Sequence, residues 1–132
     1  DLFAEQADFF SIGTNDLTQY TMAVDRGNAK VEKLYTVFHP AVLRSIRTVI
    51  KAAKQQGIPV GMCGESAADE RLIPLLLSFG LDEFSVSPSS VLQTRKNIAR
   101  WNVEQQAQLE RRVMQAKTAA QIQQILSEFF TN

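Results

Sequence analysis

Cysteine and histidine are scarce in this sequence, which has one of each among 132 residues. A single cysteine cannot close a disulfide within the chain, which excludes the small secreted scaffolds that disulfides hold together. One unpaired thiol is compatible with a reducing compartment. We therefore expect a cytoplasmic protein.

An excess of charge of either sign is also missing, because 14 Lys and Arg residues balance 14 Asp and Glu residues. Without a basic field, the chain has no electrostatic means of recruiting nucleic acid or an acidic membrane surface. No apolar run approaches the roughly 20 residues of a membrane-spanning helix, and no signal peptide is visible. The composition predicts a globular chain of at most one domain, with no nucleic-acid partner and no membrane insertion.

The lone cysteine, Cys63, ends a short apolar run and has glycines on both sides, in residues 59–65 with the sequence PVGMCGE. Glycine lets the backbone and a ligand approach closely. A thiol at the end of a strand is therefore placed for chemistry. The alternative is a small buried hydrophobe, because free cysteine is among the most buried residue types.

A second informative segment covers residues 8–20, DFFSIGTNDLTQY, where an apolar strand runs into polar residues. Backbone N–H groups there can bind an anion, and the carboxylate of Asp16 can hold a hard cation such as Mg²⁺. Arg26 follows in the same connection, and its guanidinium matches the geometry of a phosphate. Together these groups predict a phosphorylated, metal-bound small substrate.

These segments carry a family resemblance that covers nearly the whole chain. Residues 10–20 and 23–28 (AVDRGN) resemble the phosphoenolpyruvate-utilising enzymes, and within them most closely phosphoenolpyruvate–protein phosphotransferase, enzyme I of the bacterial sugar phosphotransferase system. Residues 61–65 (GMCGE) and 68–71 (ADER) match a second motif of that family. Residues 81–87 (LDEFSVS) match its last barrel strand.

The resemblance implies a role for each matching residue. Asn15 and Asp16 match positions that contact phosphoenolpyruvate, and Asp16 also matches a ligand of the cofactor Mg²⁺. Arg26 matches a phosphate-binding arginine. Cys63 matches the catalytic proton donor that turns enolpyruvate into pyruvate. Glu65 stays open between a second metal ligand and a residue that orients its loop.

The resemblance also implies an activity and partners for a parent enzyme. That enzyme transfers the phosphoryl group of phosphoenolpyruvate, through an enzyme histidine, to a histidine-containing phosphocarrier protein and releases pyruvate. It is expected to be a homodimer. The histidine, two further substrate arginines and a second metal carboxylate have no counterpart here, so the isolated chain is expected to be inactive. The alternatives are a relative of pyruvate phosphate dikinase or phosphoenolpyruvate synthase, or a non-catalytic oligomerisation module.

The order of the elements predicts an α/β fold. Strands are expected at 8–13, 60–64 and 84–87, and helices near 16–23, from Pro40 to Gly57, from 72 to Gly80, and from about 90. Strand–helix repeats imply a parallel sheet with right-handed crossovers. With the resemblance, the chain is interpreted as the last three βα units of a (βα)8 TIM-type barrel, about 8–102, followed by C-terminal helices, about 103–132. All of residues 1–132 would form one C-terminal part of a phosphoenolpyruvate-binding domain.

Side-chain size alternates along each expected strand. Small residues on one face would line a substrate mouth, and large apolar residues on the other face would pack against helices. The small residues are Ser11, Gly13, Gly61, Cys63, Ser85 and Ser87, and the large ones are Phe10, Ile12, Val60, Met62, Phe84 and Val86.

Other residues receive structural interpretations. His39 precedes Pro40 at a helix start, which favours a polar cap over a phosphorylated histidine. Residues 69–71 are expected to be a charge cluster at a helix start, and Trp101 a packing anchor. Residues 103–117 predict a solvated helix, and Thr118 opens a capping box before the last helix.

Overall fold

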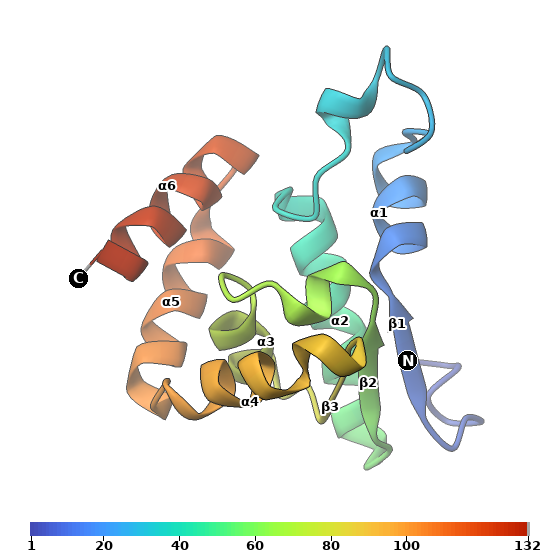
Figure 1. Ribbon diagram of the computed structural model, residues 1–132. Helices are drawn as coiled ribbons and strands as arrows, with labels where there is room; N and C mark the ends of the chain where they lie inside the picture. The colour runs from blue at the N-terminus through green and yellow to red at the C-terminus, as the bar shows by residue number, and fades with distance from the viewer. Residues whose placement is uncertain (132) are drawn as a thin grey trace.

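A computed structural model describes residues 1–131 of the chain (Figure 1). Three parallel strands, β1 (Phe10–Gly13), β2 (Val60–Cys63) and β3 (Glu83–Ser85), form one sheet in the order β1-β2-β3. The α helices are α1 (Thr14–Met22), α2 (Pro40–Gln56), α3 (Ile73–Phe79), α4 (Val91–Ala99), α5 (Val103–Gln115) and α6 (Ala119–Thr131). Short 3-10 helices are η1 (Glu32–Leu34), η2 (Glu65–Ala68) and η3 (Pro88–Ser90). The predicted α/β class and parallel sheet are confirmed.

Helix α2 shows how local sequence sets the boundaries of an element. His39 caps it, because its Nδ1 accepts a hydrogen bond from the Ala41 N–H at 3.2 Å. Pro40 occupies the first turn, where its missing N–H has no intrahelical partner to lose. Gly57 ends the helix in the left-handed conformation, at φ 70°. The structural interpretation of His39 is therefore confirmed.

Some predicted boundaries are wrong. The first strand begins at Phe10 rather than Asp8, and the third covers Glu83–Ser85 rather than 84–87. Helix α1 begins directly after β1, at Thr14, so the expected polar turn is its first turn. The residues through Ala7 have a sequence that favours the tail of a helix. They form turns, including one bond from the Ala7 N–H to the Phe3 carbonyl at 3.0 Å.

The sheet confirms the predicted separation of small and large side chains. Ser11 lies in register with Gly61, and Cys63 lies between Gly13 and Ser85. Ser11, Cys63 and Ser85 are exposed. Ile12, Val60 and Met62 are buried on the opposite face, at 5%, 0% and 1% exposure. Alternation along a strand thus leaves one face of the sheet open and covers the other.

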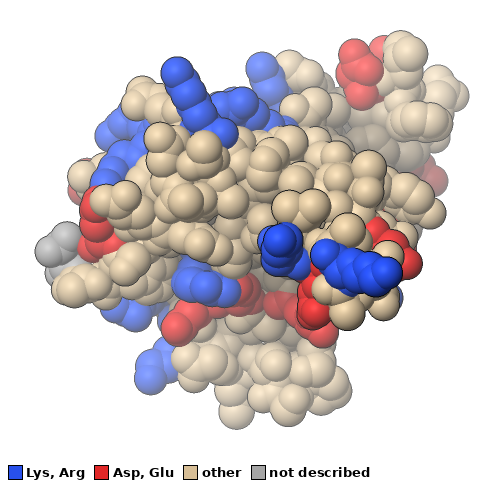
Figure 2. All heavy atoms as spheres, turned by 90° about the horizontal axis from the view of Figure 1, so that it is seen from above, with Lys and Arg blue, Asp and Glu red and all other residues tan. Residues whose placement is uncertain are grey.

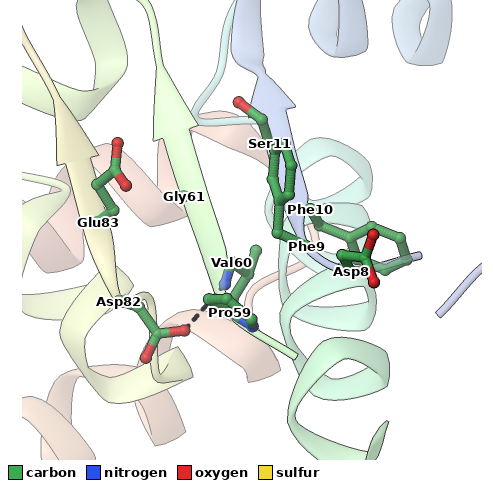
Figure 3. Close-up of a pocket in the computed structure, with 9 residues that line it drawn as sticks. All are labelled: Asp8, Phe9, Phe10, Ser11, Pro59, Val60, Gly61, Asp82 and Glu83. Carbon is green, nitrogen blue, oxygen red and sulfur yellow. Dashed lines mark hydrogen bonds between the residues drawn. The ribbon is translucent and has the colours of Figure 1, made fainter. Parts of the chain in front are cut away.

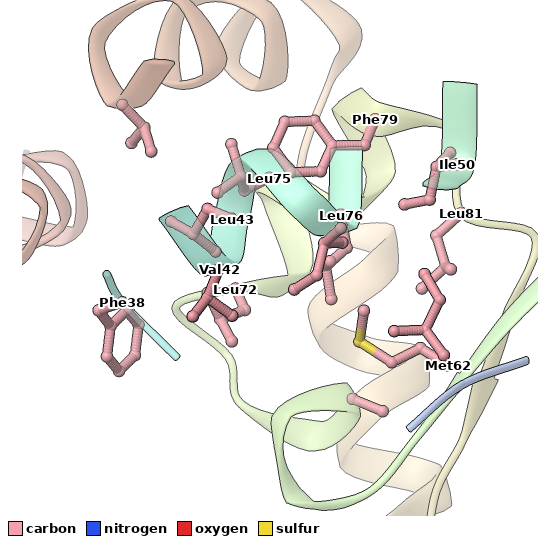
Figure 4. Packing of buried hydrophobic residues seen from close by; sticks show 14 of the residues in the cluster. Phe38, Val42, Leu43, Ile50, Met62, Leu72, Leu75, Leu76, Phe79 and Leu81 are labelled. Atoms are coloured by element: carbon pink, nitrogen blue, oxygen red, sulfur yellow. The ribbon is translucent and has the colours of Figure 1, made fainter. Parts of the chain in front are cut away.

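The covered face of the sheet packs on α2 and α3. Figure 4 shows Met62 among leucine and isoleucine side chains, including Ile50 of α2, Leu76 of α3 and Leu81, which follows α3. Burying apolar side chains of this size stabilises a fold by about 1.5–3 kcal/mol each relative to exposure. This core fixes β2, and therefore Cys63 at its end, against the rest of the chain.

The C-terminal helices belong to the same apolar core. Leu109 of α5 and Ile122 of α6 are both 0% exposed. The Arg47 Nε donates to Glu110 at 2.8 Å, and the Arg44 guanidinium donates to the Ala116 carbonyl at 3.1 Å. The prediction of a solvated helix over 103–117 is therefore wrong for one face of α5, which packs on α2 and α3.

Two capping arrangements precede these helices. Asn102 and Gln105 form a reciprocal capping box at the start of α5, which was not predicted. The predicted box at α6 is confirmed in part. The Gln121 N–H donates to the Thr118 hydroxyl at 3.2 Å, but the Gln121 side chain accepts from Lys117 rather than from the cap residue. Trp101 anchors the helix ends by stacking on Phe129 with ring centroids 5.0 Å apart, as predicted.

No helix formed by residues 1–131 is long and apolar enough to cross a membrane.

An ion pair at the start of β3 gives a pH-dependent contribution to stability. The hydrogen bond from Lys54, together with one from the Val60 N–H at 2.9 Å, lowers the pKa of Asp82 below its usual value. A lowered folded-state pKa stabilises the fold above the unfolded-state pKa, and this contribution is lost as the pH falls through the folded-state pKa. We expect Asp82→Asn to lower the free energy of unfolding by about 0.5 kcal/mol at neutral pH, because both partners are exposed.

The difference between wild type and Asp82→Asn should shrink from pH 7 to an acidic pH below the usual pKa of aspartate, because protonation of the carboxylate removes the ion pair. Urea unfolding at the two pH values measures it. Asp8→Asn, which changes an exposed carboxylate outside this ion pair, is the matched control. An Asp82→Asn effect that stays constant between the two pH values would contradict the assignment.

Candidate functional site

The thiol of Cys63 lies at the carboxyl end of β2. It is exposed, so the alternative that it is a buried hydrophobe is wrong. Its Sγ lies 3.7 Å from the carbonyl oxygen of Ile12 on the neighbouring strand, to which it donates a hydrogen bond. This contact orients the S–H bond toward β1, and the exposed sulfur atom remains accessible to a bound molecule.

A tight corner joins the ends of β1 and β2. Thr14, only 1% exposed, donates from its hydroxyl to the Cys63 carbonyl at 3.2 Å. Gly64 follows with φ 96° and ψ 178°, a conformation open essentially to glycine alone. A Cβ built on Gly64 would lie 2.9 Å from the Thr14 Oγ1. The corner therefore fixes the direction in which the chain leaves Cys63.

Asn15 is brought to this corner from the first turn of α1. Its amide oxygen and nitrogen both lie 3.9 Å from a Cβ built on Gly64. The Tyr35 hydroxyl donates to the Asn15 carbonyl oxygen at 3.1 Å and lies 3.4 Å from its Oδ1. These side chains and Glu65 line a recess of about 250 Å³. Asn15 thus lies next to Gly64, the residue that follows Cys63, while the Cys63 thiol itself contacts the Ile12 carbonyl and does not line this recess.

Asp16 and Arg26 are both exposed and lie on α1 and on the connection that follows it. Within residues 1–131, neither the Asp16 carboxylate nor the Arg26 guanidinium has a protein partner. The Arg26 backbone N–H donates to the Gln19 Oε1 at 3.3 Å, which ties the connection to α1. Both of these charged groups are therefore available to a ligand.

A divalent cation would find one candidate ligand here. Among residues 1–131, no three side chains of the His, Cys, Asp and Glu types come together as a metal site. Mg²⁺ keeps several waters and is often held by one or two carboxylates together with substrate phosphates. The exposed carboxylate of Asp16 fits that partial role, and Glu65, exposed in η2, is the nearest second carboxylate along the loop after Cys63.

The loop after Cys63 is braced by a charge pair, as predicted for residues 69–71. Arg71 donates to Asp69 through its Nε at 3.0 Å and its Nη2 at 2.6 Å, and this hydrogen bonding raises the pKa of Arg71. The same guanidinium lies over the Phe38 ring, 4.5 Å from its centroid. Since both charges are used within the protein, this cluster supports the loop.

Two contributors to the site were not predicted. Thr14 was expected only as part of a polar turn, and Tyr35 was not singled out. Each acts through a hydrogen bond to a residue 49 or 20 positions away along the chain. A pattern in the sequence does not reveal such pairs, because they arise from the packing of separate elements.

The larger hollow of the molecule lies at the other end of the sheet. It measures about 580 Å³ and is lined by the beginnings of the three strands. Figure 3 shows Ser11, Gly61 and Glu83 side by side there, with Asp82 bonded to Val60. In open α/β sheets, ligands bind outside the carboxyl ends of the strands. The chemistry is therefore assigned to the Cys63 end.

The surface above this end carries charges of both signs. Figure 2, seen from above, shows acidic and basic side chains interspersed on a largely uncharged face. Such a surface provides no broad attraction for an anion. Recognition of a phosphorylated substrate would therefore depend on individual groups such as Arg26.

Comparison with known proteins gives a consistent family match. Residues 1–103 match the family described as PEP-utilising enzyme, PEP-binding domain. The chain is 46% identical over 132 residues to a phosphoenolpyruvate-protein phosphotransferase of Staphylococcus carnosus, covering 100% of this chain and 23% of that protein. It is 52% identical over 126 residues to the protein of the same name from Haemophilus influenzae, covering 96% and 22%. The chain therefore spans less than a quarter of the length of these relatives.

Proposed function

The chain belongs to the PEP-utilising enzymes, and from that membership we propose that it forms the C-terminal part of a phosphoenolpyruvate–protein phosphotransferase. The observation that carries this proposal is that Cys63 ends β2 and Asn15 directly follows β1, so that both residues lie at the carboxyl ends of two paired parallel strands. The names of the relatives favour a phosphotransferase over the alternative of a dikinase or synthase.

The sheet supports an incomplete barrel as the scaffold. The three strands, each followed by a helix, would be the last βα units of a (βα)8 barrel at about 8–102, with the helices of 103–132 packed beside them. The open face with its small side chains would then point into the barrel. Within residues 1–131, β1 and β3 each have one edge without a partner strand, which further units would pair.

The substrate would be held by groups of different chemistry. The Arg26 guanidinium would bind the phosphate through charge-assisted hydrogen bonds. The Asn15 amide would donate to an oxygen of the same substrate. Asp16 would hold Mg²⁺ together with the phosphate oxygens, and when bound the ion neutralises phosphate charge.

Cys63 would complete the reaction at carbon. As the phosphoryl group leaves, the enolate of pyruvate remains, and its methylene carbon must take a proton. The Cys63 S–H bond breaks, a C–H bond forms, and a thiolate is left, which makes the thiol a general acid. Its exposure beside Asn15 is what this step requires.

The rest of the reaction would lie outside this chain. The phosphoryl acceptor would be a histidine of a preceding domain, and the final acceptor a histidine-containing phosphocarrier protein. The working enzyme would be a homodimer, and residues 1–132 alone would be inactive because the acceptor and part of the substrate clamp are missing.

A chimera tests the proposed function. Residues 1–132 replace the matching segment of the Haemophilus influenzae relative, and transfer from phosphoenolpyruvate to a phosphocarrier is measured without ATP. An active chimera supports the proposal. A folded chimera that binds no phosphoenolpyruvate and transfers no phosphoryl group contradicts it.

Variants of this chimera test the proposed roles of Arg26 in phosphate binding and of Asp16 in Mg²⁺ binding. Arg26→Ala removes charge-assisted bonds, so we expect phosphoenolpyruvate affinity to fall by about 10- to 150-fold. Asp16→Asn should instead raise the Mg²⁺ concentration needed for half-maximal rate. Arg111→Ala, which removes an exposed arginine of α5, is the matched control. If neither variant differs from that control in substrate or metal affinity, the assigned roles are wrong.

A further inference from the structure

Tyr35 is the one side chain in the described recess that holds Asn15 by a hydroxyl group. It is half-buried and lies directly after η1. Its single phenolic hydrogen faces two oxygens of the same residue, the carbonyl oxygen at 3.1 Å and Oδ1 at 3.4 Å. A hydroxyl can donate only one hydrogen. That hydrogen is therefore shared between the backbone carbonyl and the side-chain oxygen of Asn15, with the shorter contact to the carbonyl.

The direction of the Asn15 amide follows from this contact. With Oδ1 turned toward the phenol, the NH₂ end is left to donate to another group. Without the hydroxyl, the Asn15 side chain would keep no hydrogen bond within residues 1–131 to fix the direction of its amide. An amide that rotates freely presents its acceptor to an anionic oxygen as often as its donor.

The hydrogen bond from Tyr35 to Asn15 also anchors the segment after α1 that carries Arg26. This connection is tied to α1 near its beginning by the Gln19 side chain, and again at its end by Tyr35. Between the two ties, Asp25 and Asn28 each accept a backbone N–H two residues ahead, at 2.9 and 3.0 Å. The segment is thus a braced loop, and the Tyr35 hydroxyl fastens its far end to Asn15.

We propose that Tyr35 is a positioning residue for phosphoenolpyruvate, which acts through the Asn15 amide. This role rests on the proposed function. The hydroxyl does not touch the reacting atoms. It sets which end of the amide faces the substrate and holds the loop that carries Arg26 over the same end of the sheet. Its contribution is to substrate affinity and not to the proton transfer at Cys63.

The test uses steady-state kinetics of the chimera. Tyr35→Phe removes one hydroxyl and keeps the ring, and we expect the KM for phosphoenolpyruvate to rise about five- to tenfold with kcat nearly unchanged. The matched control is Tyr20→Phe, which removes a hydroxyl from the chain's other tyrosine, 80% exposed on α1. That control should leave both constants unchanged.

A double-mutant cycle separates positioning from a general loss of structure. In an Asn15→Ala background, Tyr35→Phe should raise KM by no more than about twofold, because the group it orients is gone. Equal effects of Tyr35→Phe with and without Asn15 would overturn the role, as would a fall in kcat with KM unchanged. The role would also be overturned if, in an active chimera, Tyr35→Phe had the same KM and kcat as Tyr20→Phe. That outcome would leave the proposed function unaffected. An unsubstituted chimera that transfers no phosphoryl group would overturn both.

Discussion

Replacing Cys63 by serine in the chimera is expected to lower pyruvate formation by about 10²- to 10⁴-fold, the range that a positioned general acid contributes. Serine keeps the small polar shape and can still donate to the Ile12 carbonyl, so the corner at β2 is retained. Its hydroxyl is a far weaker acid than a thiol, so the enolate carbon loses its proton donor. Affinity for phosphoenolpyruvate should change little.

Two measurements keep this expectation specific. Calorimetry gives the affinity for phosphoenolpyruvate, and single-turnover assays give the rate at which pyruvate appears. Ser127→Ala is the matched control, because Ser127 is exposed on α6 and lies outside the sheet face that carries Cys63. Near-normal pyruvate formation by Cys63→Ser would rule out the thiol as the proton donor.

The faces of the sheet could be predicted from the sequence because side chains alternate strictly along a strand. Phe10, Ile12, Val60 and Met62 alternate with small residues, and this pattern alone places Cys63 on the open face. The boundaries of β3 could not be predicted as well. Its pairing with β2 begins at Glu83, a charged residue that the apolar pattern excluded from the strand.

The ends of a helix could be predicted where the backbone chemistry of a single residue determines them. Pro40 lacks an N–H, and Gly57 adopts a left-handed conformation, so each marks an end of α2 by itself. The buried face of α5 was missed because Gln, Glu and Arg dominate its composition. Two apolar residues, Leu109 and Val113, suffice to pack it on α3 when they lie one turn apart.

Some residues of the candidate site could be predicted from the sequence, and others could not. Cys63, Asn15, Asp16 and Arg26 come from motifs that are contiguous in sequence, so the resemblance could identify them. The contact of Tyr35 with Asn15 depends on how η1 returns to α1, and no local pattern contains that information. Residues that act directly are thus easier to identify from sequence than residues that hold them in place.

Replacing Gly64 by alanine is the second change with a large expected effect, because two costs coincide at this position. The conformation at φ 96° and ψ 178° is strained for any residue with a Cβ, by about 1–3 kcal/mol. The added Cβ would also lie 2.9 Å from the Thr14 Oγ1, which bonds the Cys63 carbonyl. To relieve this contact, Thr14 or the end of β2 must move.

Gly57→Ala is the control that separates strain from displacement. Gly57 is also left-handed, at φ 70°, but nothing lies within 4 Å of its built Cβ and it caps α2 at the other end of the sheet. Both variants should lower the melting temperature of the chimera. Only Gly64→Ala should also lower kcat/KM, by about 10²-fold, because a shift of about 1 Å at a reacting group has that effect. Equal activity of the two folded variants would mean that the corner around Gly64 does not position Cys63 and Asn15.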